Sequence, residues 1–246
     1  MIMDIKRIIG CPCLPIMESD VDSFFINNIS NKGYTVAINA EKILRYKSNV
    51  ELKEIIDNSI YPYPDGAGAV ISLNWLYGMK SEKINMPILS LEYANKNKTK
   101  TFIAGADADM HNKAINMINK IYPNIKLVGN MHGFNEEIEI MKGIERSKPD
   151  LILLALGSPR QEILAAKIVR KIEHGIVVGC GGALDIIAGK IKRAPKFMID
   201  NNLEWAYRIM QEPWRIKRQF FLPKFFFLLL LEVVKNFFSK GNLENK

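Results

Sequence analysis

Residues 151–172 read LILLALGSPRQEILAAKIVRKI. The apolar run Leu151 to Leu156 is followed by a Gly-Ser-Pro turn and then by an amphipathic stretch that continues to Ile172. A short buried strand that turns directly into a helix is the repeating unit of proteins in which helices cover a parallel sheet. The stretch therefore predicts an α/β fold.

The same alternation extends in both directions, over Thr35 to Gly179. The predicted strands are Thr35 to Ile38, Thr101 to Ala104, Ile125 to Val128, Leu151 to Leu156 and Ile176 to Val178. The predicted crossover helices are Val50 to Asn58, His111 to Ile121, Asn135 to Ser147 and Pro159 to Ile172. Because parallel strands need such crossovers, we expect a mostly parallel sheet flanked by helices.

The composition favours one main domain with an appendage. A chain of 246 residues with 48% hydrophobic residues can bury one substantial core. Beyond that core, Leu203 to Gln211 predicts a helix, Pro213 begins a second, basic helix, and Phe220 to Phe238 is rich in Phe, Leu and Val. We therefore divide the chain into a core, residues 1–195, and a helical appendage, residues 196–246.

The appendage combines positive charge with apolar side chains. The formal net charge is +8, and Lys190 to Lys246 contains 12 Lys and Arg residues against 5 Asp and Glu. The longest apolar run, Phe225 to Leu231, has seven residues, whereas a membrane-spanning helix needs about 20. This combination is typical of an interfacial helix on an anionic membrane surface. The alternatives are a core-packing helix or an oligomer contact.

Neither a disulfide framework nor a metal site is predicted. The three cysteines and three histidines show no paired or metal-ligand spacing. Asp107-Ala108-Asp109 has the DxD form that holds metals in many nucleotide-sugar enzymes, but before a helix it is better explained by an N-cap and a first-turn acid. Met1 to Gly10 lacks an apolar signal core, so we expect a protein of the reducing cytoplasm.

Two polar residues follow short apolar segments, where α/β folds place their sites. Asp65, within Pro64-Asp65-Gly66-Ala67-Gly68, is a candidate general base, and its small neighbours allow a sugar or phosphate to approach the backbone. Asp65 can equally cap the helix expected over Ala69 to Tyr77. Asn39, after the strand Thr35 to Ile38, can cap the next helix or hydrogen-bond a ligand.

Gly157 to Glu162 has the form of a capping box. Ser158 is the expected N-cap, Pro159 the first helical residue and Gln161 the third. These roles do not explain Arg160, which adds a cation to a helix N-terminus that already favours anions. We therefore favour a phosphate-binding role for Arg160.

Two further groups are candidates for phosphate binding. Gly179 to Gly182 can cradle a phosphate or turn tightly, but Leu184 breaks the GxGxxG pattern, and the chain contains no Walker A sequence. Arg208, Arg215 and Arg218 would share one face of a continuous helix. Guanidinium groups suit diphosphates because they form bidentate bonds, and a solvated basic face is the alternative.

Taken in order, the motifs resemble those of one family, the WecG/TagA/CpsF glycosyltransferases (glycosyltransferase family 26). They are Asn39-Ala40-Glu41-Lys42, Pro64-Asp65-Gly66, Gly157-Ser158-Pro159-Arg160-Gln161-Glu162, Gly181-Gly182-Ala183-Leu184-Asp185, Arg193-Ala194-Pro195, Leu203-Glu204-Trp205, Tyr207-Arg208 and Gln211-Glu212-Pro213-Trp214-Arg215. The resemblance implies a Rossmann-like core and an inverting transfer that needs no metal or other cofactor. It also implies a C-terminal appendage that touches the membrane and helps close the active site.

The resemblance implies the substrates as well. Members use UDP-N-acetylmannosamine or its uronic acid, and commonly glycosylate undecaprenyl-diphosphate-linked N-acetylglucosamine in teichoic acid or surface polysaccharide synthesis. The expected partners are therefore a UDP-sugar donor, a polyprenyl-diphosphate-linked sugar acceptor and the inner face of the cell membrane, to which the protein would bind peripherally. We expect no nucleic acid partner, and the sequence leaves homo-oligomerisation open.

The motifs and the resemblance together define the candidate site. Asp65 is the expected general base, and the expected substrate-binding residues are Asn39, Gly66, Lys83, Arg160, Gln161, Arg208, Arg215 and Arg218. Two residues depart from the family pattern: Ala37 stands where a hydroxyl residue is frequent, and Lys83 where arginine is usual. Lys83 keeps the positive charge but loses the bidentate fork, which puts donor identity or efficiency in question.

Two other functions are alternatives. A nucleotide-cofactor oxidoreductase on a Rossmann-like sheet is the main alternative, and the missing glycine fingerprint counts against it. A non-catalytic module that binds a membrane or nucleic acid through its basic tail gives no reason for Asp65 in its loop or for Gln161 beside Arg160. A glycosyltransferase accounts for all three residues.

Overall fold

A computed structural model gives the structure of the chain and describes residues 4–190, 195, 197–198, 204–211, 213, 216 and 220–241. Its centre is a six-stranded sheet of order β4-β3-β8-β7-β5-β6, in which every neighbouring pair is parallel. The strands are β3 (Lys32–Ile38), β4 (Tyr61–Pro64), β5 (Lys100–Gly105), β6 (Lys126–Met131), β7 (Leu151–Ala155) and β8 (Gly175–Gly179). They overlap all five predicted strands, so the predicted α/β fold is confirmed.

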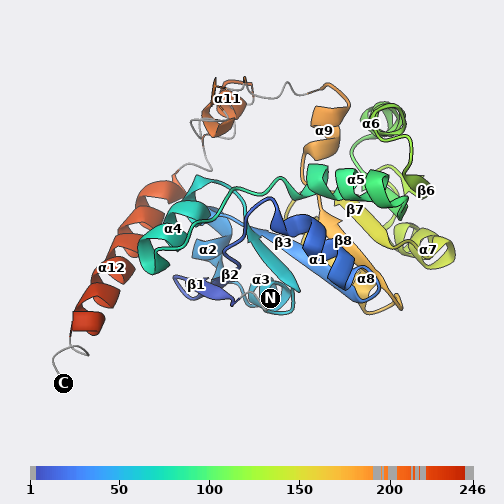
Figure 1. Cartoon of the computed structure of the whole chain (residues 1–246). Helices are drawn as coiled ribbons and strands as arrows, with labels where there is room; N and C mark the ends of the chain where they lie inside the picture. Colours follow the sequence, from blue (N-terminus) through green and yellow to red (C-terminus); the bar gives the residue numbers. More distant parts are fainter. Residues whose placement is uncertain are drawn as a thin grey trace.

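Helices cover both faces of the sheet (Figure 1). One face carries α2 (Ala40–Tyr46), α3 (Val50–Asp57), α7 (Glu137–Ser147) and α8 (Arg160–Val169), and the other α1 (Asp20–Asn28), α5 (Met86–Asn97), α6 (Ala108–Ile121) and α9 (Ala183–Ile187). Strand β7 shows why, because Ile152 and Leu154 join the first core while Leu151 and Leu153 join the second. Successive side chains of a strand point to opposite faces, and here both faces are apolar.

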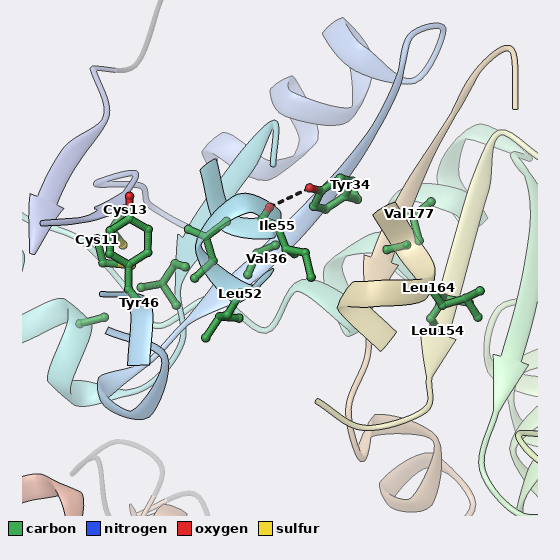
Figure 2. Close-up of a cluster of buried hydrophobic side chains, with 14 of the residues drawn as sticks. Cys11, Cys13, Tyr34, Val36, Tyr46, Leu52, Ile55, Leu154, Leu164 and Val177 are labelled. Atoms are coloured by element: carbon green, nitrogen blue, oxygen red, sulfur yellow. Dashed lines mark hydrogen bonds between the residues drawn. The ribbon is translucent and has the colours of Figure 1, made fainter. Parts of the chain in front are cut away.

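The first of these cores lies between the sheet and helices α2, α3 and α8 (Figure 2). Val36 of β3 and Leu164 of α8 are almost fully buried in it. At its rim the hydroxyl of Tyr34 donates to the carbonyl of Ile55 at 2.7 Å, which ties β3 to α3. Burial raises the pKa of Tyr34 to about 12, so this hydroxyl remains a donor at neutral pH.

The N-terminal part contains elements that were not predicted. Strands β1 (Lys6–Ile8) and β2 (Cys11–Cys13) form an antiparallel hairpin ahead of α1. Three-residue strands carry too little periodicity to be recognised, and Pro12 within β2 argues against a strand on sequence grounds. Cys11 and Cys13 are buried in the first core, and both are free thiols.

The C-terminal helix α12 (Phe221–Gly241) packs against α2 and α4 (Ala67–Tyr77) at one end of the fold (Figure 1). Phe225 and Leu229 are fully buried, and the amide of Ile9 donates to Glu232 Oε2 at 2.7 Å. The core-packing alternative is therefore correct for this side of the helix. Within the described residues, none of the helices combines the length and the apolar character that crossing a membrane requires.

The remainder of the appendage is described only in part. Helix α11 (Glu204–Gln211) confirms the helix predicted over Leu203 to Gln211. Most of the basic helix predicted from Pro213 lies outside the described residues. The same holds for Arg215, Arg218 and the side chain of Arg208, although the backbone of Arg208 belongs to α11.

Candidate functional site

The parallel sheet collects the candidate residues at one edge. Asn39 follows β3, Asp65 follows β4, Gln161 lies in the first turn of α8 after β7, and Gly181 follows β8. The strand order makes β4, β3, β8 and β7 successive neighbours, so the four loops adjoin one another. Open α/β sheets bind ligands at this carboxyl edge. We refer to the carboxyl edge of these four strands as the candidate site.

Asp65 is fixed by the backbone of the neighbouring strand. Its amide donates to the carbonyl of Ile38 at 2.8 Å, which continues the pairing of Ile38 with Pro64. Gly66, with a φ of 95°, occupies the N-cap position of α4, so Asp65 is not the N-cap residue of that helix. The turn leaves Asp65 half-buried at the end of β4.

The surroundings of Asp65 are open on one side and basic on another. A Cβ added to Gly66 would meet no atom within 4 Å, so a ligand can approach the backbone there. The loop between α4 and α5 crosses the end of β4, where the amide of Ile84 donates to the carbonyl of Pro64 at 3.1 Å. The structure thereby brings the exposed Lys83, adjacent to Ile84, to the candidate site.

Asn39 is the N-cap of α2. Its Oδ1 accepts a hydrogen bond from the amide of Lys42 at 3.0 Å, which satisfies one of the unpaired amides at the helix start. The capping interpretation is confirmed, and the ligand-binding interpretation stays a prediction. Capping also fixes the side chain of Asn39 one residue beyond the end of β3, beside the turn that holds Asp65.

The predicted capping box at α8 is wrong. Helix α8 begins at Arg160 with Pro159 in the N-cap position, and no side chain caps it. Gln161 instead reaches across the edge of the sheet: its Oε1 accepts from the amide of Gly181 at 2.9 Å. A Cβ on Gly179 would lie 2.6 Å from Gln161 Nε2, so the glycine makes room for this side chain. The sequence pattern predicted a local cap, whereas the side chain of Gln161 makes a long-range contact.

Arg160 points towards the other half of the sheet. Its Nη1 donates to the carbonyl of Gly133 at 3.1 Å, and its Nε lies 3.6 Å from Glu137 Oε1. A hydrogen bond from Lys167, and Arg160 itself, hold the pKa of Glu137 below its usual value. Strand β7 lies three strands from β4, about 14 Å at the usual spacing. Arg160 and Asp65 can therefore contact only different parts of one extended ligand.

The DxD sequence has the structural role that was expected of it. Asp107 is the N-cap of α6 and accepts from the amide of Met110, and this bond together with Lys190 lowers the pKa of Asp107. Asp109 lies in the first turn of the same helix. In the described part of the chain, no three His, Cys, Asp or Glu side chains lie close enough together to hold a metal ion.

Three buried polar residues of the candidate site were assigned no role from the sequence. Lys42 Nζ lies 2.7 Å from Glu162 Oε1, and both side chains are buried. Burial raises the pKa of Tyr63 well above its ordinary value, and the nearby Asp65, Cys180 and Glu162 raise it further. Lys and Glu near helix starts normally indicate a solvated surface, so only the motifs that contain Lys42 and Glu162 could have drawn attention to them.

Comparison with known proteins adds the family. The family model described as "Glycosyl transferase WecG/TagA/CpsF family" matches residues 8–238. A Bacillus subtilis (strain 168) protein named N-acetylglucosaminyldiphosphoundecaprenol N-acetyl-beta-D-mannosaminyltransferase is 33% identical over 183 residues, which cover 73% of this chain and 72% of that protein. A Bacillus spizizenii protein with the same name is 30% identical over 231 residues, covering 86% of each chain.

Proposed function

The chain belongs to the WecG/TagA/CpsF family of glycosyl transferases, and we propose that it transfers N-acetylmannosamine, or its uronic acid, from UDP to undecaprenyl-diphosphate-linked N-acetylglucosamine. The resemblance drawn from the ordered motifs is thereby confirmed, and the oxidoreductase alternative is set aside. Support for the substrates comes from the two Bacillus relatives, whose shared name specifies N-acetylmannosaminyl transfer and this acceptor. The product would serve teichoic acid or surface polysaccharide synthesis.

The position of Asp65 is the observation that carries the proposal. A half-buried carboxylate lies at the carboxyl end of β4, beside Asn39, the N-cap of α2, and the open backbone of Gly66. In the proposed reaction, Asp65 takes the proton from an acceptor hydroxyl, and the oxygen attacks the anomeric carbon of the donor. The bond between that carbon and the UDP oxygen breaks as the new glycosidic bond forms. Attack opposite the leaving group inverts the anomeric centre and requires only one base.

The departing UDP carries negative charge that basic side chains can stabilise. Lys83 supplies one cation next to Asp65, and Arg160 supplies another beyond β7. Arg208, Arg215 and Arg218 stay predicted diphosphate ligands from the appendage. We propose that cations from this set neutralise the leaving diphosphate and that the reaction needs no divalent metal.

The exposed side of α12 supports peripheral membrane binding. Among the side chains of this helix that the structure describes, seven large apolar ones are exposed: Phe221, Phe226, Phe227, Leu230, Leu231, Val234 and Phe237. Apolar side chains on a helix within a basic segment favour shallow insertion among anionic headgroups. We propose that α12 holds the protein on the inner face of the cell membrane, where a polyprenyl-linked acceptor is embedded.

The test is UDP release by the purified protein. UDP-N-acetylmannosamine and its uronic acid are offered in turn, each with and without a lipid-diphosphate N-acetylglucosamine acceptor, in the presence of EDTA. Acceptor-dependent release with either donor supports the reaction and its independence of metals. Release that appears only after Mg²⁺ or Mn²⁺ is added would overturn the metal-independent mechanism, and no release under any of these conditions would overturn the proposed substrates.

A further inference from the structure

Three loops of the candidate site must be aligned although they follow three different strands. Helix α2 follows β3, helix α8 follows β7, and the turn at Gly181 follows β8, which lies between the other two. The backbone pairing of β3 with β8 ends at Tyr34 and Val177, before the loops that follow these strands. Between β8 and β7 it ends with the amide of Cys180, which donates to the carbonyl of Leu154. Side chains make the further connections among the three loops.

A continuous series of polar contacts, two of them buried and two partly buried, makes this connection. Lys42 of α2 donates through Nζ to the carbonyl of Ala37 at 2.9 Å and to Glu162 Oε1 of α8 at 2.7 Å. Gln161 Nε2 donates to the same carboxylate oxygen at 3.3 Å. Gln161 Oε1 then accepts from the amide of Gly181 at 2.9 Å. The series runs from the end of β3 to the turn after β8.

The chemistry of the series determines which way the amide of Gln161 points. The backbone amide of Gly181 can only donate, so it requires the oxygen of Gln161, and a carboxylate can only accept, so it requires the nitrogen. A reversed amide would place two donors together at Gly181 and two acceptors together at Glu162. Glu162 therefore selects the orientation of Gln161, provided that its side chain stays in place.

Lys42 holds the side chain of Glu162 in place. The side chains of Lys42 and Glu162 are only 8% and 3% exposed. Glu162 Oε2 is also buried, and it has no hydrogen-bond partner among the described residues. A buried ion pair adds little stability compared with apolar side chains of similar volume, whereas a buried charge without its partner is strongly destabilising. Stability alone thus gives no reason to place this pair here.

We infer that Lys42 and Glu162 are a positioning pair, which orients the amide of Gln161 and aligns the loops after β3, β7 and β8 for transfer. This inference rests on the proposed function and on the substrate-binding role predicted for Gln161 from the sequence. Neither Lys42 nor Glu162 needs to touch the substrate. Their effect on turnover passes through Gln161 and Gly181.

The test compares Lys42→Met, Glu162→Met and the double variant Lys42→Met/Glu162→Met, which also removes the acceptor of Gln161 Nε2, with the wild-type protein. Lys42→Met leaves a buried carboxylate without its cation, so its thermal midpoint falls. The double variant removes both charges, and its midpoint returns close to the wild-type value. The kcat of the double variant with a water-soluble acceptor nevertheless stays at least tenfold below wild type. The Gly181 amide of the double variant also exchanges with solvent faster, which hydrogen exchange of a peptide containing Gly181 measures.

Tyr34→Phe is the matched control. Like Lys42 and Glu162, Tyr34 of β3 is a buried hydrogen-bonding residue, and it donates to the carbonyl of Ile55 at 2.7 Å. The substitution should leave both kcat and exchange at Gly181 unchanged. A double variant with wild-type kcat and wild-type exchange at Gly181 would overturn the inference while leaving the proposed function intact. A wild-type protein that releases no UDP would instead overturn the proposed function, and the inference with it.

Discussion

Phe225 of α12 packs directly on Gly68 of α4. A Cβ added to Gly68 would lie 3.2 Å from the ring of Phe225 and 3.5 Å from the Cβ of Ala40. Gly68 lies three residues after Asp65, and Ala40 directly follows Asn39. The C-terminal helix therefore rests on the first turns of the two helices that begin at the candidate site. It is part of the support of Asp65 and Asn39.

This packing predicts the effect of Phe225→Ala. Removal of a fully buried phenylalanine should lower the free energy of unfolding by about 3 kcal/mol, and turnover of a water-soluble acceptor should fall because the first turn of α4 loses its support. Denaturant titration and steady-state kinetics measure the two effects. Phe227→Ala, at a position 61% exposed on the same helix, should change the unfolding free energy by less than about 0.5 kcal/mol. Equal effects of the two substitutions would refute the packing argument.

The exposed side of α12 predicts membrane binding that substitutions can abolish without loss of transferase turnover on a water-soluble acceptor. Replacing Phe227, Leu230 and Phe237 by Ser should weaken binding to anionic phospholipid vesicles about 100-fold, because each side chain contributes about 1 kcal/mol when it inserts. Turnover should fall for a membrane-embedded acceptor and stay unchanged for a water-soluble one. Vesicle sedimentation measures the binding, and UDP-release assays with each of the two acceptors measure turnover.

A matched control uses exposed apolar residues of the core helices. Ile26, Val50 and Ile138 are 62%, 72% and 52% exposed on α1, α3 and α7. Their replacement by Ser should leave vesicle binding unchanged. If it weakened binding as much as the α12 substitutions do, the membrane contact would not be specific to α12.

Replacement of Lys83 by arginine should improve binding of the UDP-sugar donor. Lys83→Arg restores a bidentate donor for phosphate at the site and should lower KM for the UDP-sugar about fivefold, which corresponds to about 1 kcal/mol. Lys80→Arg, three residues earlier at another exposed position, serves as the control and should leave KM unchanged. An unchanged or higher KM for Lys83→Arg would show that the side chain does not contact the diphosphate.

Because its three thiols are buried, the native protein should resist modification by thiol reagents. Cys11, Cys13 and Cys180 are all buried, and burial raises the pKa of Cys11 and of Cys180 to about 12. Since the thiolate is the reactive form, the native protein should react with no equivalents of Ellman's reagent at pH 8 within minutes. After unfolding in guanidinium chloride, all three cysteines of the sequence should react. Rapid loss of activity on treatment of the native protein would contradict the buried position of Cys180 beside the candidate site.

The sequence predicted the sheet well and its N-terminal surroundings poorly, for physical reasons. Leu151 to Leu156 is apolar without interruption because β7 is buried on both faces, and this signal is strong. Strands β1 and β2 have three residues each, too few for a period to show. Asp65 and Asn39 could be placed because each directly follows a strand.

The contacts within the site were beyond sequence patterns. Gln161 matched a capping box, although its partner is the amide of Gly181, 20 residues away. Lys42 and Glu162 lie 120 residues apart. Each, considered alone, is a residue type common on helix surfaces. Only the strand order, which places β3, β8 and β7 side by side, shows that they meet.

Asp65→Asn tests the central claim most directly. The amide matches the carboxylate in size but cannot accept a proton from the acceptor hydroxyl, so acceptor-dependent UDP release should fall about 1000-fold while circular dichroism and thermal midpoint stay at wild-type values. Asp109→Asn, which alters an exposed carboxylate on α6 paired with Lys113, should retain full turnover. Release by Asp65→Asn within tenfold of the wild-type rate would contradict the role of Asp65 as the general base.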